Sequence, residues 1–201
     1  MTTNNSRKAY AREMMCIVRE APKCAKIEIA LMFDVYDLEG LMFPHKDTLV
    51  ITPIIENCPV KRVHVDNGVF MDIQFYDTFF RMGYNDSQLA PSDVPFYGFN
   101  RVVCKFKGII QHLLIVRKEL RGVMQMLNFQ VVKEASTYNA IFGRIRIHAF
   151  KEVPTTYHMV LTFLTRNGIG EERGDQKMAS SCYVASLRPD GSGGRSSQYK
   201  V

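Results

Sequence analysis

The 201-residue sequence contains no tryptophan and few cysteines, and each shortage excludes a class of protein. The five cysteines, Cys16, Cys24, Cys58, Cys104 and Cys182, are odd in number and never spaced as Cys-x-x-Cys. This spacing signals neither a disulfide framework nor a zinc site, so we expect reduced thiols and a cytoplasmic protein. No apolar run approaches the roughly 20 residues that cross a bilayer, and the N-terminus has no apolar signal core, so we expect no membrane contact.

Common catalytic and cofactor motifs are also missing. The sequence has no phosphate-binding Gly-x-x-x-x-Gly-Lys, no Gly-x-Gly-x-x-Gly, no His-Glu-x-x-His and no Gly-x-Ser-x-Gly. The five histidines stand at no metal-ligand spacing, and a lone histidine in a strand, such as His64, is more often structural than a ligand. We therefore expect no metal and no cofactor.

The net charge is modest. Lys and Arg number 26 against 20 Asp and Glu, a formal charge of +6, and much of the excess lies within residues 7–26 and 101–121. Neither basic set is interleaved with aromatic residues at a spacing typical of base stacking. Nucleic-acid binding by a Gag-like fragment is therefore the weakest hypothesis, and nucleic acid is an improbable partner.

The chain reads as many short strands separated by turns. Residues 7–20 predict an amphipathic helix in a basic leader, residues 1–26, and a helical turn at 78–82 ends at Gly83. We predict a loop at 167–177, a last short apolar run at 182–187, and strands at residues 27–33, 48–55, 60–65, 69–75, 94–99, 107–116, 126–132, 138–142 and 157–164. In the strand at 69–75, Asp72 and Gln74 alternate with apolar residues and predict one solvent-facing side. The pattern predicts an all-β barrel or sandwich with little helix.

The stretch VHVDNGV, residues 63–69, has two interpretations. Asn-Gly between alternating apolar residues is the strongest short-range signal for a hairpin turn. Alternatively, an apolar strand delivers Asp66 into a tight glycine-containing loop, which is how a rigid scaffold holds a catalytic carboxylate. The residues of this stretch alone leave both interpretations open.

Longer stretches resemble a known family. A second apolar strand, residues 138–142, also ends at a glycine, Gly143. The segments FPHKDTLVITPII, VKRVHVDNGVFMDIQFYDTFFRMG, MLNFQVVKEASTYNAIFGR, TTYHMVLTF and RGDQKMASSCYVASL follow one another between residues 30 and 188. In this order they are similar to the retropepsin-like aspartic protease region of plant gypsy-type LTR retrotransposon Gag-Pol polyproteins.

The resemblance implies a fold and a set of site residues. It implies a closed retropepsin-like barrel with one short helix over residues 27–165, followed by an extension and tail at 166–201. Asp66 matches the catalytic aspartate, and Asn67 and Gly68 complete its loop. The resemblance places the second loop segment at Ile141, Phe142 and Gly143, and the substrate-covering flap at Tyr97, Gly98, Phe99 and Asn100.

The chemistry that the resemblance implies needs two carboxylates that share one proton, one acting as base toward water and the other as acid toward the peptide carbonyl. Asp77 is followed by Thr78 and Phe79 and is not a second catalytic aspartate. The second carboxylate must then come from a twofold-related copy of Asp66, so activity on a polyprotein or peptide substrate requires a homodimer.

Several residues depart from the family pattern. Val69 and Phe70 replace small residues after the glycine, and His64 and Gln74 place polar atoms where the core would need hydrogen-bond partners. The flap also lacks a glycine at Asn100. We therefore keep a second hypothesis beside the endopeptidase: a catalytically inactive retropepsin-like module for dimerisation or peptide binding.

Overall fold

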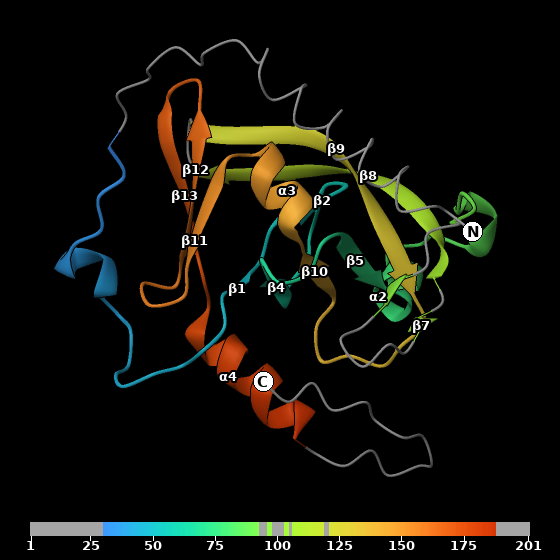
Figure 1. The fold of residues 1–201 in the computed structure, drawn as a ribbon, viewed down its shortest axis with the longest axis horizontal. Coiled ribbons are helices and arrows are strands. Elements are labelled where there is room, and N and C mark those ends of the chain that lie inside the picture. Colours follow the sequence, from blue (N-terminus) through green and yellow to red (C-terminus); the bar gives the residue numbers. More distant parts are fainter. Residues whose placement is uncertain (1–29, 93–95, 98–102, 105, 119–120, 188–201) are drawn as a thin grey trace, which may run out of the picture. The chain divides into compact units, whose positions relative to one another are not determined.

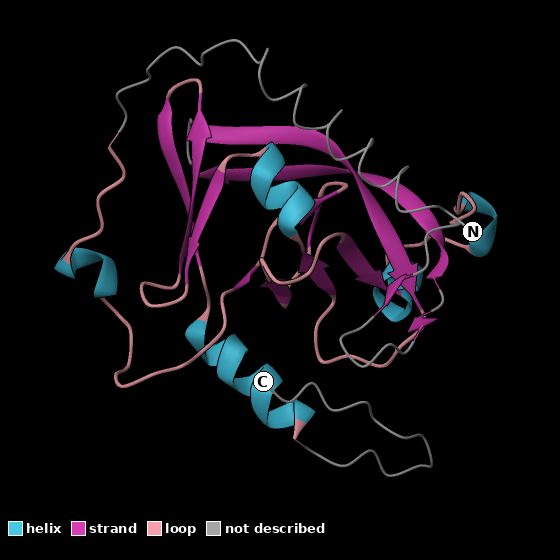
Figure 2. Ribbon diagram, in the orientation of Figure 1, coloured by secondary structure: helices cyan, strands magenta, loops and turns pink. Residues whose placement is uncertain are grey.

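The computed structural model describes residues 30–92, 96–97, 103–104, 106–118 and 121–187, and Figures 1 and 2 show its strands and helices. The described residues from Met32 onward belong to one compact unit. No helix in this described part is both long and apolar enough to span a bilayer. The predicted helix at 7–20 lies outside the described residues.

The chain is mostly β, which confirms the predicted fold class. An eight-stranded sheet has the order β1 (Val50–Ile51), β4 (Val63–Val65), β10 (Ala140–Phe142), β5 (Asp72–Phe75), β9 (Arg121–Val132), β8 (Phe106–Lys118), β2 (Ile54–Ile55), β3 (Cys58–Pro59). A second sheet has the order β11 (Glu152–Thr155), β12 (Val160–Thr165), β13 (Gly168–Arg173). A two-stranded sheet pairs β6 (Phe96–Tyr97) with β7 (Val103–Cys104).

The described residues contain more helices than the one short helix predicted for the barrel. The described residues form α2 (Tyr76–Arg81), α3 (Arg144–Ala149), α4 (Gln176–Ser186) and two 3-10 turns, η1 (Val35–Leu38) and η2 (Asp86–Gln88). The predicted helical turn that ends at Gly83 is confirmed: Gly83 adopts a left-handed φ of 88° directly after α2 and donates its N–H to Phe80 O.

The eight-stranded sheet is strongly curled, because a short stretch of chain connects strands that lie near its two opposite edges. β1 lies at one edge and β2 lies next to the opposite edge, yet only Thr52 and Pro53 separate the two strands in sequence. The Cα atoms of Ile51 and Ile54 can therefore lie at most about 10 Å apart, so the sheet must wrap around itself. Pro53 has no N–H for a ladder, which explains why the predicted strand at 48–55 breaks there.

Large apolar side chains from both main sheets fill one core. Its fully buried members include Leu49, Ile51, Phe79, Phe129, Phe142, Leu161 and Phe163. Leu161 and Phe163 belong to β12, so the second sheet packs on the same core as the barrel. Burying an apolar side chain of this size stabilises a fold by about 1.5–3 kcal/mol, and this core therefore holds the two sheets together.

Two element predictions are wrong, and a third segment gains an assignment. Residues 30–33, the described part of the strand predicted at 27–33, form no strand. The loop predicted at 167–177 is mostly strand β13, in which Gly170 allows the Phe163 ring to approach: a Cβ at Gly170 would lie 2.7 Å from the ring Cζ. The apolar run at 182–187 ends helix α4, which begins because the Asp175 carboxylate accepts the Met178 N–H at 2.9 Å.

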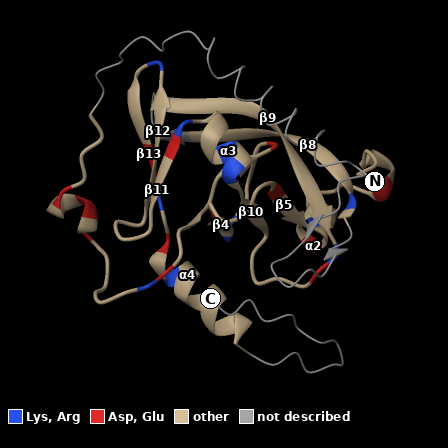
Figure 3. Ribbon diagram, in the orientation of Figure 1, with Lys and Arg blue, Asp and Glu red and all other residues tan. Residues whose placement is uncertain are grey.

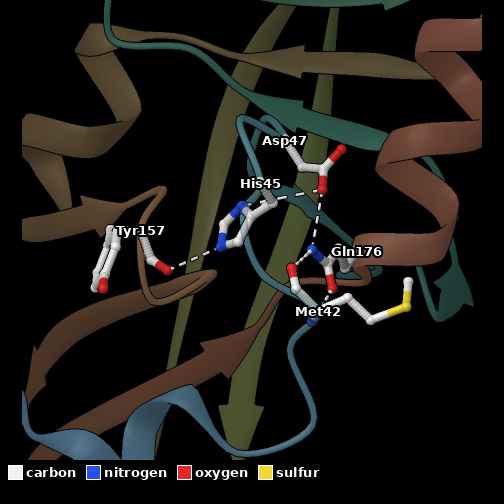
Figure 4. Close-up of polar contacts among 5 residues, drawn as sticks. All are labelled: Met42, His45, Asp47, Tyr157 and Gln176. Atoms are coloured by element: carbon white, nitrogen blue, oxygen red, sulfur yellow. Dashed lines mark hydrogen bonds and ion pairs between the residues drawn. The ribbon is translucent and has the colours of Figure 1, made fainter.

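A polar clasp holds residues 42–47 against the start of α4 (Figure 4). The Gln176 amide pairs with the Met42 backbone in both directions, accepting its N–H and donating to its carbonyl at 2.9 Å each. The same Nε2 donates to Asp47 at 3.0 Å, and His45 Nε2 donates to the Tyr157 carbonyl at 3.2 Å. The segment before β1 is therefore fixed to the C-terminal helix and to the turn before β12.

A buried ion pair joins α3 to β11. The Arg146 guanidinium donates two parallel hydrogen bonds to Glu152, at 2.8 and 2.7 Å, and both side chains are fully buried. The guanidinium also lies 3.9 Å from the centroid of the Phe142 ring. Figure 3 shows basic positions on α3 close to acidic positions in the second sheet. Because neither charge reaches water, each depends on the other for compensation.

Replacing Glu152 with glutamine should leave the buried Arg146 charge without its hydrogen-bonded carboxylate, and only the more weakly interacting Asp72 and Glu172 would then compensate it. We expect the free energy of unfolding, measured by urea denaturation, to fall by about 3 kcal/mol. Glu39→Gln, a matched change at an exposed residue, should cost less than about 0.5 kcal/mol. The double variant Arg146→Met with Glu152→Met should recover most of the loss, and a Glu152→Gln variant as stable as the control would contradict this interpretation.

Candidate active site

Strand β4 delivers Asp66 to the site. Val63 and Val65 are buried in the core on either side of His64, so the strand end is rigidly placed. β4 pairs with β1 on one side and, in parallel, with β10 on the other. It does not pair with β5, because β10 lies between them. The hairpin interpretation of Asn67-Gly68 is therefore wrong.

The chain crosses itself next to Asp66, and backbone hydrogen bonds join the two crossing segments. The Asp66 N–H donates to the Phe142 carbonyl at 2.9 Å. Further on, the Arg144 N–H donates to the Val69 carbonyl at 2.8 Å, and the Ile145 N–H donates to the Phe70 carbonyl at 3.1 Å. The structure thus places the predicted segment Ile141–Gly143 beside the predicted loop at 66–68.

Close approach explains why glycine occupies both loops. The Gly68 N–H donates to Asp66 Oδ1 at 2.8 Å, and a Cβ at Gly68 would lie 3.0 Å from that same oxygen. At Gly143, a Cβ would lie 2.7 Å from the carbonyl carbon of Met71. A side chain at Gly143 would push the two crossing segments apart, so this glycine is a steric requirement of the crossing.

The surface around the loop combines one carboxylate with apolar side chains. Asp66 is half-exposed, and Asn67 and Gly68 are exposed. Phe70 and Ile145, which the backbone bond between their main chains places side by side, are 57% and 47% exposed. Large apolar residues with this exposure next to a carboxylate form a surface that another polypeptide can cover.

His64 has a structural partner. Its imidazole stacks on the Tyr138 ring with centroids 4.8 Å apart. Burial lowers the pKa of His64, and the charge of Asp66, two residues further along, opposes that shift by raising it. Burial therefore favours the neutral ring, which packs against Tyr138 while the residue stays partly exposed.

The sequence pattern missed the role of Asp72. The predicted solvent-facing side of β5 is buried: Asp72 is 2% and Gln74 is 1% exposed. Asp72 accepts the Gly143 N–H at 2.8 Å, and Gln74 donates to Met82 Sδ and pairs with His112 Nε2 at 3.0 Å. Residues on both faces of β5 are buried, since Ile73 is buried as well as Asp72 and Gln74. The signal in the sequence that could have indicated this buried role is the aspartate inside the otherwise mostly apolar run MDIQF.

The predicted flap is only partly described. Tyr97 ends β6 and pairs in register with Val103 of the antiparallel strand β7. The other predicted flap residues, Gly98, Phe99 and Asn100, lie outside the described residues.

Asp66 has no carboxylate neighbour within the described part of the chain: the polar partners of its side chain and backbone are Gly68, Phe142 and Val69. Nor do the described residues contain any group of three or more His, Cys, Asp or Glu side chains arranged to hold a metal ion. The described site therefore supplies one carboxylate and a fixed backbone donor.

The solved structures that resemble this chain include three retropepsin-type proteins. They are the retroviral protease-like domain of Ddi1 from Leishmania major (19% identity, TM-score 0.47, 67% of this chain and 95% of that chain), a retropepsin-like aspartic protease from Rickettsia conorii (13%, 0.42, 61% and 80%) and EIAV protease complexed with the inhibitor HBY-793 (12%, 0.39, 57% and 99%). No protein-family model and no curated protein matches the chain.

Three carboxyls around Arg146 lie in an unusual electrostatic environment, and in Glu152, its hydrogen-bond partner, burial raises the pKa to about 7. Burial raises the pKa of Asp72 to about 6, and the Gly143 N–H and the Arg146 charge only partly offset this. Burial likewise raises the pKa of Glu172, on β13, to about 7, again against the attraction of Arg146. Arg146 already donates both terminal nitrogens to Glu152, so its charge is shared among several carboxylates.

The contribution of Asp72 and Glu172 to the stability of the fold should consequently fall as the pH rises. Asp72 and Glu172 bind protons more tightly when folded than when unfolded, where such groups titrate near pH 4. Their contribution is complete below about pH 4 and is lost as the pH rises through about 6 to 7. We expect this loss to appear, in urea denaturation at successive pH values, as a decline in the free energy of unfolding of the unmodified chain relative to a variant in which one of these carboxyls cannot titrate.

In the variant Asp72→Asn, the loss of free energy of unfolding between about pH 4 and pH 7 should be smaller by up to about 3 kcal/mol. The reason is that its amide oxygen can still accept the Gly143 N–H but does not titrate. Asp77→Asn, at an exposed residue of α2, serves as the control and should keep the slope. A slope that Asp72→Asn leaves unaltered would show that Asp72 titrates normally.

Proposed function

We propose that this chain is an aspartic endopeptidase that hydrolyses peptide bonds as a homodimer. One observation carries the proposal: Asp66 lies half-exposed at a chain crossing, with Gly68 N–H fixing one carboxylate oxygen at 2.8 Å. A carboxylate held by backbone donors on rigid strands is preorganised for chemistry. The other carboxylate oxygen receives no hydrogen bond from the described residues, which leaves it available to a water molecule or a second carboxylate.

The mechanism follows from pairing two such carboxylates. When two copies of Asp66 face each other, like-charge repulsion keeps one proton on the pair. The ionised Asp66 takes a proton from the water that attacks the peptide carbonyl, and the protonated Asp66 donates its proton to the carbonyl oxygen. The resulting tetrahedral intermediate collapses when the Asp66 that took a proton from water gives it to the leaving amine, and the other Asp66 takes back a proton from a hydroxyl of the intermediate. Every step uses Asp66, water and the substrate.

The exposed pair Phe70 and Ile145 supports assembly at this loop. Both side chains belong to the crossing segments that carry Asp66, so a partner that covers them also approaches the carboxylate. Burying two large apolar side chains stabilises an interface. We propose that this partner is a second copy of the chain.

The substrate that we propose is a polyprotein of a gypsy-type LTR retrotransposon, of which this chain would be a part. The support is the resemblance of the segments between residues 30 and 188, which follow the order seen in plant elements of this class. An extended peptide segment between the paired strands β6 and β7 and the Asp66 loop is the mode of substrate binding that we propose.

The second candidate is a catalytically inactive module of the same fold. Phe70 favours it, because a bulky side chain that is 57% exposed occupies the surface beside the carboxylate where substrate would pass. In that case the same surface binds a second copy or a peptide without cleaving it.

Asp66→Asn tests the endopeptidase directly. The purified chain should cleave members of a mixed peptide library between acid and neutral pH, and the variant should cleave none, because its amide cannot act as base. Asp77→Asn is the matched control and should retain activity. Cleavage that survives in Asp66→Asn would contradict the proposal, and dimerisation without cleavage by either chain would favour the inactive module.

Dilution tests the need for two copies. If each active site takes one Asp66 from each chain, the cleavage rate per chain should fall as the protein is diluted below its dimer dissociation constant, in parallel with the dimer fraction measured by sedimentation. Mixing with an excess of Asp66→Asn chains should suppress activity through mixed dimers. A rate per chain that stays constant while the dimer dissociates would exclude a shared site.

A further inference from the structure

A second cluster of polar side chains lies at the other end of β4. Asp66 follows the last residue of this three-residue strand, and Arg62 precedes the first. At about 3.3 Å per residue, the two positions are separated by about 13 Å along the strand. Arg62 and two residues of α2, Thr78 and Arg81, all donate hydrogen bonds to the side chain of Asn139, which comes directly before β10.

Three donors converge on one oxygen in this cluster. Asn139 Oδ1 accepts Thr78 Oγ1 at 2.9 Å, Arg81 Nη2 at 3.1 Å and Arg62 Nη2 at 3.4 Å. An amide oxygen has two lone pairs, so it serves three donors poorly, and it carries no negative charge. Among the described residues, neither guanidinium has a carboxylate within ion-pair distance. Two positive charges therefore face one neutral acceptor.

The backbone holds this arrangement firmly. The Asn139 N–H donates to the Arg62 carbonyl at 2.9 Å, and its carbonyl accepts the Phe75 N–H at 3.2 Å. The Asn139 side chain donates its own Nδ2 to the Lys61 carbonyl at 2.7 Å. Asn139 thus fixes the start of β4 relative to β5, and the guanidiniums approach an acceptor that cannot move toward either of them.

The cluster lines a pocket of about 490 Å³. Lys61, Arg62 and Arg81 supply its positive charge, and no acidic residue is among the described residues that line it. Most of the remaining wall is apolar and includes Val60, Met82 and Met178. An adjoining pocket, of about 410 Å³, lies on the other side of the two arginines and is lined by the carboxylates of Asp77 and Glu134. An anion would therefore enter the first pocket.

We propose that this pocket binds an organic carboxylate with an apolar body, as found at the C-terminus of a peptide whose last side chain is apolar. The carboxylate would accept hydrogen bonds from Arg62 and Arg81 in place of the Asn139 oxygen, since guanidinium donors match the two oxygens of a carboxylate. The apolar side chain of the ligand would lie against Met82 and Met178. This binding site is separate from Asp66 and does not depend on the proposed function.

Isothermal titration of the full chain with N-acetyl-leucine tests the proposal, and N-acetyl-leucinamide is the uncharged control ligand. The acid should bind and the amide should bind at least about fivefold more weakly, because a charge-assisted hydrogen bond is lost. Two variants, Arg62→Gln and Arg81→Gln, the latter at an exposed position, should each lower the affinity for N-acetyl-leucine by at least about fivefold. Arg166→Gln, in the exposed turn between β12 and β13, removes the same charge and should leave binding unchanged.

Four outcomes would overturn the proposal. Equal binding of acid and amide would mean that the charge is not recognised, and equal weakening by Arg166→Gln would mean that only net charge matters. Inorganic phosphate that binds as tightly as N-acetyl-leucine would show that the apolar wall contributes nothing. Loss of binding in Asp66→Asn would place the ligand at the candidate active site, whereas unchanged binding there supports a separate pocket.

Discussion

The insertion of β10 between β4 and β5 is the constraint on which the rest of this structure depends. β10 runs parallel to β4 and antiparallel to β5, so its backbone must satisfy both neighbours. The bond from Asp66 N–H to the Phe142 carbonyl and the bond from Gly143 N–H to Asp72 extend this pairing into the loops. Because Gly143 packs directly on the Met71 backbone, the crossing exists only with glycine at that position.

Buried charge lies beneath the crossing. Asp72 receives the Gly143 N–H, and Arg146 follows Gly143 by three residues and pairs with Glu152 at the start of the second sheet. Charged groups without access to water are costly unless each is compensated, so their positions must be maintained together. The same electrostatic network therefore ties the loop that carries Asp66 to α3, β11 and β13.

The short strand β4 connects two chemically different ends. At one end, the Gly68 N–H holds the Asp66 carboxylate next to exposed apolar side chains; at the other, two guanidiniums share the Asn139 oxygen. Both ends are rigid for the same reason, since Val63 and Val65 are buried and the strand is paired on both sides. The proposed active site and the proposed carboxylate-binding pocket thus share one strand but no residues.

The sequence by itself determined the local features: the mostly β character, the long strands around residues 107–116 and 126–132, the glycine stop after α2, and the placing of Asp66 in a tight loop. These follow from alternation, β-branched residues and turn chemistry, which act over a few residues. Only the tertiary structure decided that Asn67-Gly68 is no hairpin turn, because the strand that separates β4 from β5 comes from residues 140–142. It also decided that Asp72 and Gln74 are buried and that α4 is a helix, since burial depends on the curl of the sheet and on distant packing partners rather than on neighbours in the chain.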